Sequence, residues 1–107
     1  MSDFVRVAKV SEIPDPGKML VEVGDRLVAL IHAAGRFYAL DDVCTHDGGP
    51  LSEGPLDPQA GTITCPRHGA KFDIRTGAAL TMPATKPTQA HEVKVEGGQI
   101  FVRRRDD

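Results

Sequence analysis

Apolar and polar residues alternate at both ends of this chain with the short period of a β-strand. Near the amino terminus, runs rich in valine, leucine and alanine are separated by Gly, Pro and Asp. Near the carboxyl terminus, two further runs flank Gly97-Gly98. Short runs split by turn residues predict an antiparallel meander, and a Gly-Gly pair between two of them predicts a tight hairpin. The expected strands are residues 4–10, 18–23, 27–32, 36–40, 91–95 and 100–103.

The alternation stops at Asp41, and the composition changes between residues 41 and 84. Glycine and proline recur there, and neither a helical nor a strand period is sustained. Short strands are expected at 62–64 and 70–74, and the rest is expected to be irregular, with 55–58 at the tip of a surface loop. A long irregular segment inside a compact domain is usually either functional or disordered. The chain is therefore predicted to be all-β, an antiparallel meander that carries a small loop-rich subdomain.

Composition and charge exclude several classes of protein. The chain has 107 residues, 40% of them hydrophobic and 26% charged, which suits a single domain spanning residues 1–107. A formal net charge of −2 gives no basic face for nucleic acid. No apolar run approaches the length of a membrane helix, and the first residues do not resemble a signal peptide. We expect a cytoplasmic monomer with neither a nucleic-acid nor a membrane partner.

Candidate metal ligands gather in two short motifs of the middle segment. These are Cys44-Thr45-His46 and Cys65-Pro66-Arg67-His68, which hold the only two cysteines and two of the four histidines. Thiolates select iron–sulfur clusters, zinc or copper(I), and imidazoles suit iron and zinc. A disulfide between the cysteines is disfavoured in a reducing cytosol. The other two histidines lie on expected strands; His32 is predicted to be structural or at the surface, and His91 to face solvent.

The distribution of the four ligands separates two kinds of metal site. A Cys₂His₂ set is a standard tetrahedral zinc site, but a zinc finger commonly takes its cysteines from one segment and its histidines from another. Here each segment supplies one of each. That arrangement favours two adjacent metal centres, each held by both loops. A structural zinc module that only mediates interactions remains the alternative.

With its C-x-H motif followed by C-x-x-H, the sequence resembles the Rieske iron–sulfur family over nearly its whole length. The resemblance implies a Rieske-like sandwich and one 2Fe–2S cluster per chain. It assigns Cys44 and Cys65 to one iron and His46 and His68 to the other. The residues after the second motif also match Rieske ferredoxins, and a proline stands where the family has a loop that covers the cluster; these are Phe72, Asp73, Thr76, Gly77 and Pro83.

Four positions of this chain differ from the respiratory branch of the Rieske family. Cytochrome bc-type Rieske proteins have an extra cysteine in each ligand loop, where this chain has Gly49 and Arg67. They also have a serine and a tyrosine that donate hydrogen bonds to cluster sulfurs, where this chain has Ala70 and Phe72. Such donors raise the reduction potential. Their absence predicts a potential near the low end of the Rieske range of about −150 to +300 mV.

The resemblance therefore implies an electron-transfer component and not an enzyme. The expected role is a one-electron carrier between a flavoprotein ferredoxin reductase and a terminal oxygenase of the ring-hydroxylating type. The alternative is the Rieske-like small subunit of an assimilatory nitrite reductase. Acidic residues near the first motif either guide a basic partner or form only a solvated rim; they are Asp41, Asp42, Asp47 and Glu53.

Overall fold

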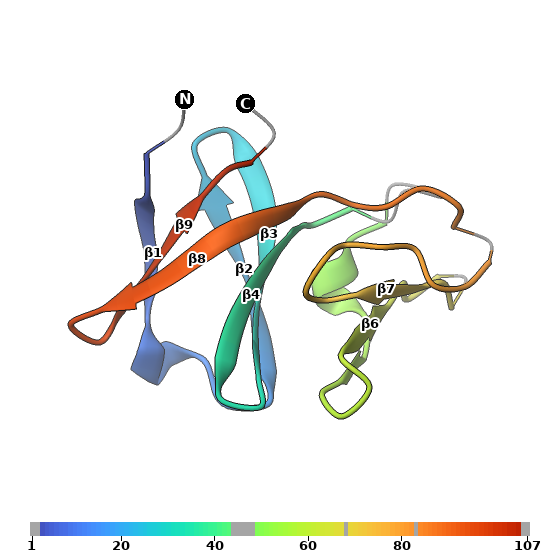
Figure 1. Ribbon diagram of the computed structural model, residues 1–107, viewed down its shortest axis with the longest axis horizontal. Coiled ribbons are helices and arrows are strands. Elements are labelled where there is room, and N and C mark those ends of the chain that lie inside the picture. The colour runs from blue at the N-terminus through green and yellow to red at the C-terminus, as the bar shows by residue number, and fades with distance from the viewer. Residues whose placement is uncertain (1–2, 44–48, 68, 83, 106–107) are drawn as a thin grey trace.

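A computed structural model describes residues 3–43, 49–67, 69–82 and 84–105 (Figure 1). Its regular structure is β-strand apart from two single-turn 3-10 helices. The all-β prediction is therefore confirmed. The strands are β1 (Val5–Lys9), β2 (Gly17–Val23), β3 (Arg26–Ala33), β4 (Arg36–Asp41), β5 (Leu56–Asp57), β6 (Thr62–Thr64), β7 (Lys71–Asp73), β8 (Ala90–Glu96) and β9 (Gln99–Arg103), and the 3-10 helices are η1 (Val10–Glu12) and η2 (Leu51–Glu53).

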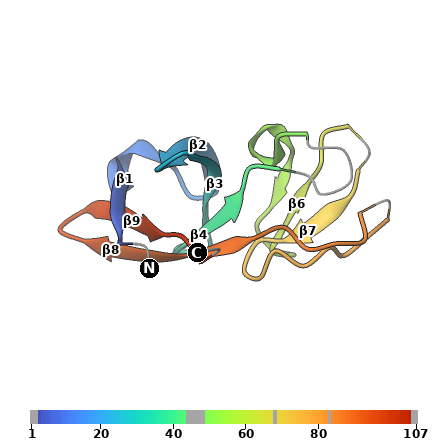
Figure 2. The same ribbon diagram turned by 90° about the horizontal axis from the view of Figure 1, so that it is seen from above.

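The larger sheet has six antiparallel strands in the order β1-β9-β8-β4-β3-β2. A short ladder between β4 and β8 joins its two halves, at Ala39 with His91 and Leu40 with Ala90. Because this junction is short, the halves fold over one another, and β1 returns to the side of β2 (Figure 2). The result is the predicted antiparallel sandwich, with one apolar core enclosed between the two halves.

A smaller sheet in the order β5-β6-β7 lies beside the larger one and is formed by the chain between β4 and β8 (Figure 1). One part of it differs from expectation. The predicted loop tip at 55–58 contains β5, in which Leu56 pairs with Ile63 and Asp57 with Thr62. The Asp57 carboxylate accepts hydrogen bonds from the backbone amides of Gln59 and Ala60. This side chain therefore closes the turn that aligns β5 with β6.

Strand β3 separates two apolar cores. Residues 28–31 are fully buried, so both faces of the strand are covered. Val28 and Leu30 pack in the sandwich core, whereas Ile31 and Ala33 pack under the small sheet. The sequence of a strand that is covered on both faces is a continuous apolar run, without alternating polar residues. The sandwich therefore provides the wall on which the loop-rich segment rests.

Two features of the sandwich follow the sequence closely. Gly97 and Gly98 have φ values of +57° and +75°, as the closing hairpin between β8 and β9 requires. His32 has a structural role, as predicted, because its Nδ1 lies 3.0 Å from the Ile13 carbonyl oxygen and its ring stacks on Phe37.

Candidate metal centre

The second predicted ligand loop is a tight turn directly after β6. The Cys65 amide donates to the Ala70 carbonyl oxygen at 2.7 Å, and the Gly69 amide donates to the Cys65 carbonyl oxygen at 3.1 Å. Gly69 has a φ of +75°, which favours glycine. The two bonds close the loop across residues 65 to 70. Cys65 lies inside at 1% exposure while Arg67 lies outside and is exposed.

The surroundings of Cys65 suit a metal-bound thiolate. Its side chain belongs to the apolar core under the small sheet, together with Ala70 and Phe72, which are both fully buried. A lone thiolate would be costly to bury in such surroundings, whereas a bound cation supplies the compensating charge. This part of the structure therefore fits the sulfur side of a cluster. The predicted ligands Cys44, His46 and His68 lie outside the described residues.

Hydrogen bonds hold the chain in place both before and after the first motif. Asp42 follows β4 and accepts the Ser52 amide on its Oδ1 at 2.6 Å. Lys18 of β2 donates from its Nζ to the Ser52 carbonyl oxygen at 2.7 Å. Leu51, in the same 3-10 turn, is fully buried. The sandwich thus holds η2 in place just after the first ligand loop.

Gly54 brings the chain after the first motif into contact with the second. A Cβ atom at this position would lie 1.6 Å from the Thr64 carbonyl oxygen, so a larger residue would force the backbones apart. The Thr64 amide donates to the Pro55 carbonyl oxygen at 3.0 Å in the same contact. Thr64 immediately precedes Cys65. The sequence offers no signal for this requirement, because Gly54 is one glycine among several in an irregular segment.

The segment after β7 packs against the second ligand loop. The Leu80 amide donates to the Lys71 carbonyl oxygen at 2.8 Å, and the Lys71 amide donates to Thr81 Oγ1 at 2.9 Å. Farther along, a Cβ on Gly77 would lie 2.1 Å from the Thr88 carbonyl oxygen, and the φ of Gly77 is +81°. The turn that follows β7 is thus closely packed against the chain at Thr88. Pro83 lies outside the described residues.

The prediction of a solvent-facing His91 is wrong. Its side chain is fully buried, with Nε2 2.7 Å from Asp41 Oδ1, and its Nδ1 accepts the Arg105 amide at 3.1 Å. Since Nδ1 accepts, Nε2 carries the proton and donates to the carboxylate. Arg26 donates to the other carboxylate oxygen of Asp41 at 2.7 Å. This network lies where β4 leaves the sheet toward the first motif and where β8 re-enters it.

Asp41 is consequently not part of an acidic surface. Its carboxylate is committed to Arg26 and His91, and the residue is 7% exposed. Its backbone amide also donates to the Gln89 carbonyl oxygen at 2.8 Å. Asp41 therefore joins the strand that leaves the sandwich to the strand that returns, a role that its place among other acidic residues conceals.

Comparison with known proteins decides the family. A model of the Rieske [2Fe-2S] domain matches residues 3–94. This chain belongs to the Rieske family. One 2Fe–2S cluster per chain follows from that membership, and the zinc alternative is set aside.

Curated relatives of this chain are named as ferredoxin subunits of a dioxygenase. The 3-phenylpropionate/cinnamic acid dioxygenase ferredoxin subunit of Photorhabdus laumondii is 44% identical over 96 residues, 90% of each chain. The subunit of the same name from Escherichia coli K12 is 40% identical over 93 residues, 87% of this chain and 86% of that one. The chain is accordingly an electron-transfer component and not itself an enzyme.

Solved structures give the same result for the fold. The ferredoxin of carbazole 1,9a-dioxygenase from Nocardioides aromaticivorans IC177 superposes with a TM-score of 0.92 at 29% identity, covering 95% of this chain and 98% of that one. An oxidised ferredoxin in complex with the reduced oxygenase of carbazole 1,9a-dioxygenase superposes with a TM-score of 0.88 at 33% identity, covering 97% of each chain. In the part of this chain that the structure describes, no helix is long and apolar enough to cross a membrane.

Proposed function

We propose that this protein is the ferredoxin of a ring-hydroxylating dioxygenase system and passes single electrons from a flavoprotein ferredoxin reductase to the terminal oxygenase. The observation that supports this most directly is the match, over about nine tenths of both chains, to dioxygenase ferredoxin subunits. A solved ferredoxin–oxygenase complex of the same fold supports the oxygenase as one of the partners. These relatives favour the dioxygenase carrier over the nitrite reductase subunit.

Within this proposal the cluster is held by Cys44, His46, Cys65 and His68. The cluster supplies reversible one-electron chemistry when bound. Cys65 contributes a thiolate from the buried base of its loop, shielded from water by apolar neighbours. The paired motifs and the tight turn at 65–70 support the assignment.

The potential is expected to lie low in the Rieske range. Neither Ala70 nor Phe72 has a hydroxyl that can donate to a cluster sulfur, and both side chains are fully buried beside the second loop. A hydrogen-bond donor near sulfur stabilises the more negative, reduced cluster, so its absence makes reduction harder. The cytoplasmic location and the monomeric state remain predictions from the sequence.

Two measurements test the proposal. Aerobically purified protein should be red-brown and contain iron and acid-labile sulfide in equal amounts, and Cys65→Ala should remove the colour. The other components of the E. coli K12 3-phenylpropionate/cinnamic acid dioxygenase system should then oxidise 3-phenylpropionate only when this protein is added. A colourless protein with one bound zinc would refute the cluster, and a coloured protein that supports no turnover would refute the carrier role.

A further inference from the structure

The two ligand motifs lie in segments of opposite charge. Between residues 41 and 57 every charged residue is acidic, whereas between 65 and 88 Asp73 is the only acid among four basic residues. Asp73 is matched by its neighbour Arg75, whose Nε lies 3.5 Å from Asp73 Oδ1. The other cations on the side of the second motif are Arg67, Lys71 and Lys86.

On the side of the first motif, fewer carboxylates are available to a partner than the sequence indicates. Asp41 is buried in its network with Arg26 and His91, and Asp42 accepts the Ser52 amide. On the basic side, by contrast, the residues are exposed, and neither Arg67 nor Lys71 has an ion-pair partner among the residues that the structure describes. Unpaired exposed charge is what steers a charged partner during encounter.

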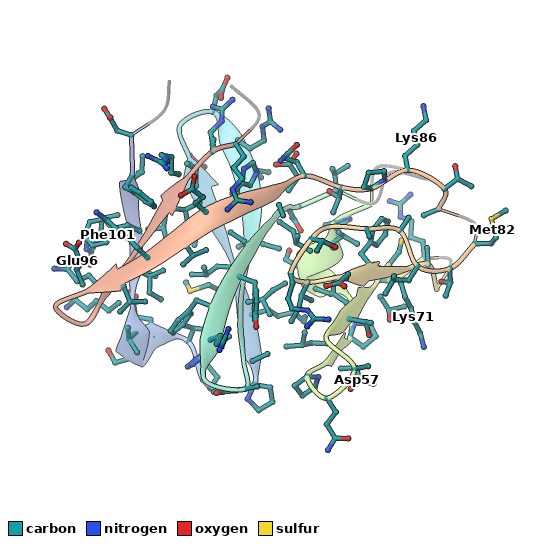
Figure 3. The ribbon with its side chains drawn as sticks, in the orientation of Figure 1. Asp57, Lys71, Met82, Lys86, Glu96 and Phe101 are labelled. Carbon is teal, nitrogen blue, oxygen red and sulfur yellow. The ribbon has the colours of Figure 1, made fainter. Side chains whose placement is uncertain are left out.

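Exposed apolar side chains lie next to Lys71, in the segment that follows β7. Met82 is 73% exposed and Leu80 is 50% exposed. The Leu80 amide is bonded to the Lys71 carbonyl oxygen, so these residues lie side by side. In Figure 3, Met82, Lys71 and Lys86 lie at the same end of the molecule, opposite to Glu96 and Phe101 on the hairpin of the sandwich; Lys86 and Lys71 project to opposite sides of that end, and Met82 lies between them.

The apolar residues are held in place by the fold. Thr81, between Leu80 and Met82, accepts the Lys71 amide through its hydroxyl at 2.9 Å. A single exposed apolar residue is ordinary, but an apolar pair rimmed by exposed cations has the composition of an interface centre and its rim. Methionine is also common on surfaces that adapt to a partner.

We propose that the surface formed by Pro66, Arg67, Lys71, Leu80, Met82 and Lys86, here named the second-loop surface, docks the electron-donating partner. The matching surface on that partner would carry carboxylates around a shallow apolar depression. The inference rests on the proposed function, because it assumes that the protein exchanges electrons with separate proteins. It predicts that the electron donor is acidic where it docks and that it docks on the side of the second ligand loop.

The charge of the cluster favours the donor over the acceptor. With two thiolate and two neutral imidazole ligands, an oxidised 2Fe–2S cluster is formally neutral, and reduction adds one negative charge. The oxidised protein therefore presents the more positive second-loop surface. An acidic partner binds the oxidised form more tightly and releases it once the electron has arrived, as suits a donor.

The test compares two charge-neutralised variants with the wild type. Arg67→Gln/Lys71→Gln removes one arginine and one lysine from the second-loop surface. Arg36→Gln/Lys9→Gln is the matched control on the sandwich, where both side chains are exposed. Stopped-flow absorbance follows two separate steps with the E. coli K12 dioxygenase components, namely reduction of the oxidised protein and reoxidation of the reduced protein by the oxygenase. Voltammetry gives the potential of each variant, so that a change in driving force is separated from a change in docking.

At low ionic strength we expect reduction of the second-loop variant to be about tenfold slower, with a flatter salt dependence, and the control to match the wild type. Met82→Gln should slow reduction at high salt as well, because it removes apolar contact and not charge. Equal rates in variant and control would overturn the inference, as would slowing confined to the oxygenase step. A wild type that is never reduced would overturn the proposed function itself.

A second measurement needs no protein partner. The chemically reduced protein is oxidised either by anionic ferricyanide or by cationic tris(phenanthroline)cobalt(III). Loss of Arg67 and Lys71 charge should slow the first reagent and accelerate the second, while the control variant changes neither. An unchanged ratio of the two rates would show that these cations do not set the field at the cluster, and the inference would fall.

Discussion

The sandwich and the segment between β4 and β8 are both built from β-strands, but different contacts hold them. In the sandwich, β2 and β3 share seven register pairs and β3 and β4 share six, so long ladders fix the strands. In the small sheet, β5 and β6 share two pairs and β6 and β7 share three. Ladders this short cannot fix a fold, so single close contacts and the cluster must contribute the rest.

The apolar cores differ in the same way. The sandwich encloses its core between its own strands, whereas the second core is completed by Ile31, Ala33 and Leu40 of the sandwich wall. The middle segment adds large apolar side chains of its own to this core, because it buries Leu51 and Phe72 completely. Cys65 is itself a member of this core. The ligand loop is thus placed by packing on a sheet that does not need the cluster.

Removing the cluster should separate the two regions most clearly. We expect hydrogen-exchange protection between residues 41 and 84 to fall by about a hundredfold or more after the cluster is lost, while the sandwich strands stay protected. The reason is that metal–ligand bonds would link the two loops directly, in addition to the contact between Gly54 and Thr64. Hydrogen exchange measured by mass spectrometry, with and without the cluster, gives the comparison. Equal protection in the middle segment would show that packing alone holds it.

The next effect is expected from Gly54→Ala. The added methyl group would collide with the Thr64 carbonyl oxygen, and backbone cannot rotate away as a flexible side chain can. We expect a loss of about 3 kcal/mol in unfolding free energy, the upper end of typical overpacking, together with incomplete cluster incorporation. Denaturant unfolding and iron content measure the two effects.

Gly97→Ala serves as the control for this substitution. It also replaces a glycine in a turn, but no atom lies within 4 Å of where the added Cβ would stand, so only the strain of its φ of +57° applies. That strain costs about 1 kcal/mol and should leave the iron content unchanged. Similar behaviour of the two variants would show that the contact with Thr64 does not hold the ligand loops together.

How far the sequence predicted these two regions differs as well. The strands of the sandwich agree with the predicted ranges to within one or two residues, because alternation and turn residues are local signals. The ligand motif also stands out locally, since few patterns mix Cys and His in this way. The strand β5 and the contact at Gly54 were missed, because each depends on a backbone segment that approaches only after folding.

Polar residues at the junction were misjudged for a related reason. Asp41 and His91 are fifty positions apart in the sequence, and each has the usual identity of a surface residue. Only the pairing of β4 with β8 brings them together under the chain that leads to the first motif. Two polar residues that form a hydrogen bond only after folding leave no periodic pattern in the sequence around either of them.

Asp41→Ala tests whether this junction supports the middle segment. The substitution leaves the Nε2 proton of a fully buried His91 without its acceptor, which costs about 1–3 kcal/mol. Asp25→Ala is the control, because its carboxylate also pairs with an arginine, Arg104, but is 92% exposed and worth at most about 1 kcal/mol. Denaturant unfolding compares the two variants. Equal losses would remove Asp41 from the contacts that join the two regions.

The smallest expected effect lies inside the second ligand loop and concerns the potential. Ala70 and Phe72 lack hydroxyls where the respiratory relatives of this family have them. A donor to sulfur gains strength when an electron is added, because the sulfur becomes more negative. A differential gain of about 1 kcal/mol corresponds to roughly 40 mV, since a tenfold change in equilibrium constant is about 59 mV for a one-electron couple. Ala70→Ser and Phe72→Tyr should each raise the midpoint by tens of millivolts, and together by more.

Ala33→Ser is the matched control for the serine variant, because Ala33 is equally buried in the second core but lies on β3 and not in a ligand loop. It should lose stability without changing the potential. Voltammetry at neutral pH, with absorbance to confirm an intact cluster, distinguishes the two positions. No rise in either loop variant would refute the hydrogen-bond account, and a wild-type midpoint well above zero would refute the low potential. Because the sandwich variant changes stability alone, a rise confined to the loop variants would show that the small sheet tunes the cluster while the sandwich only supports it.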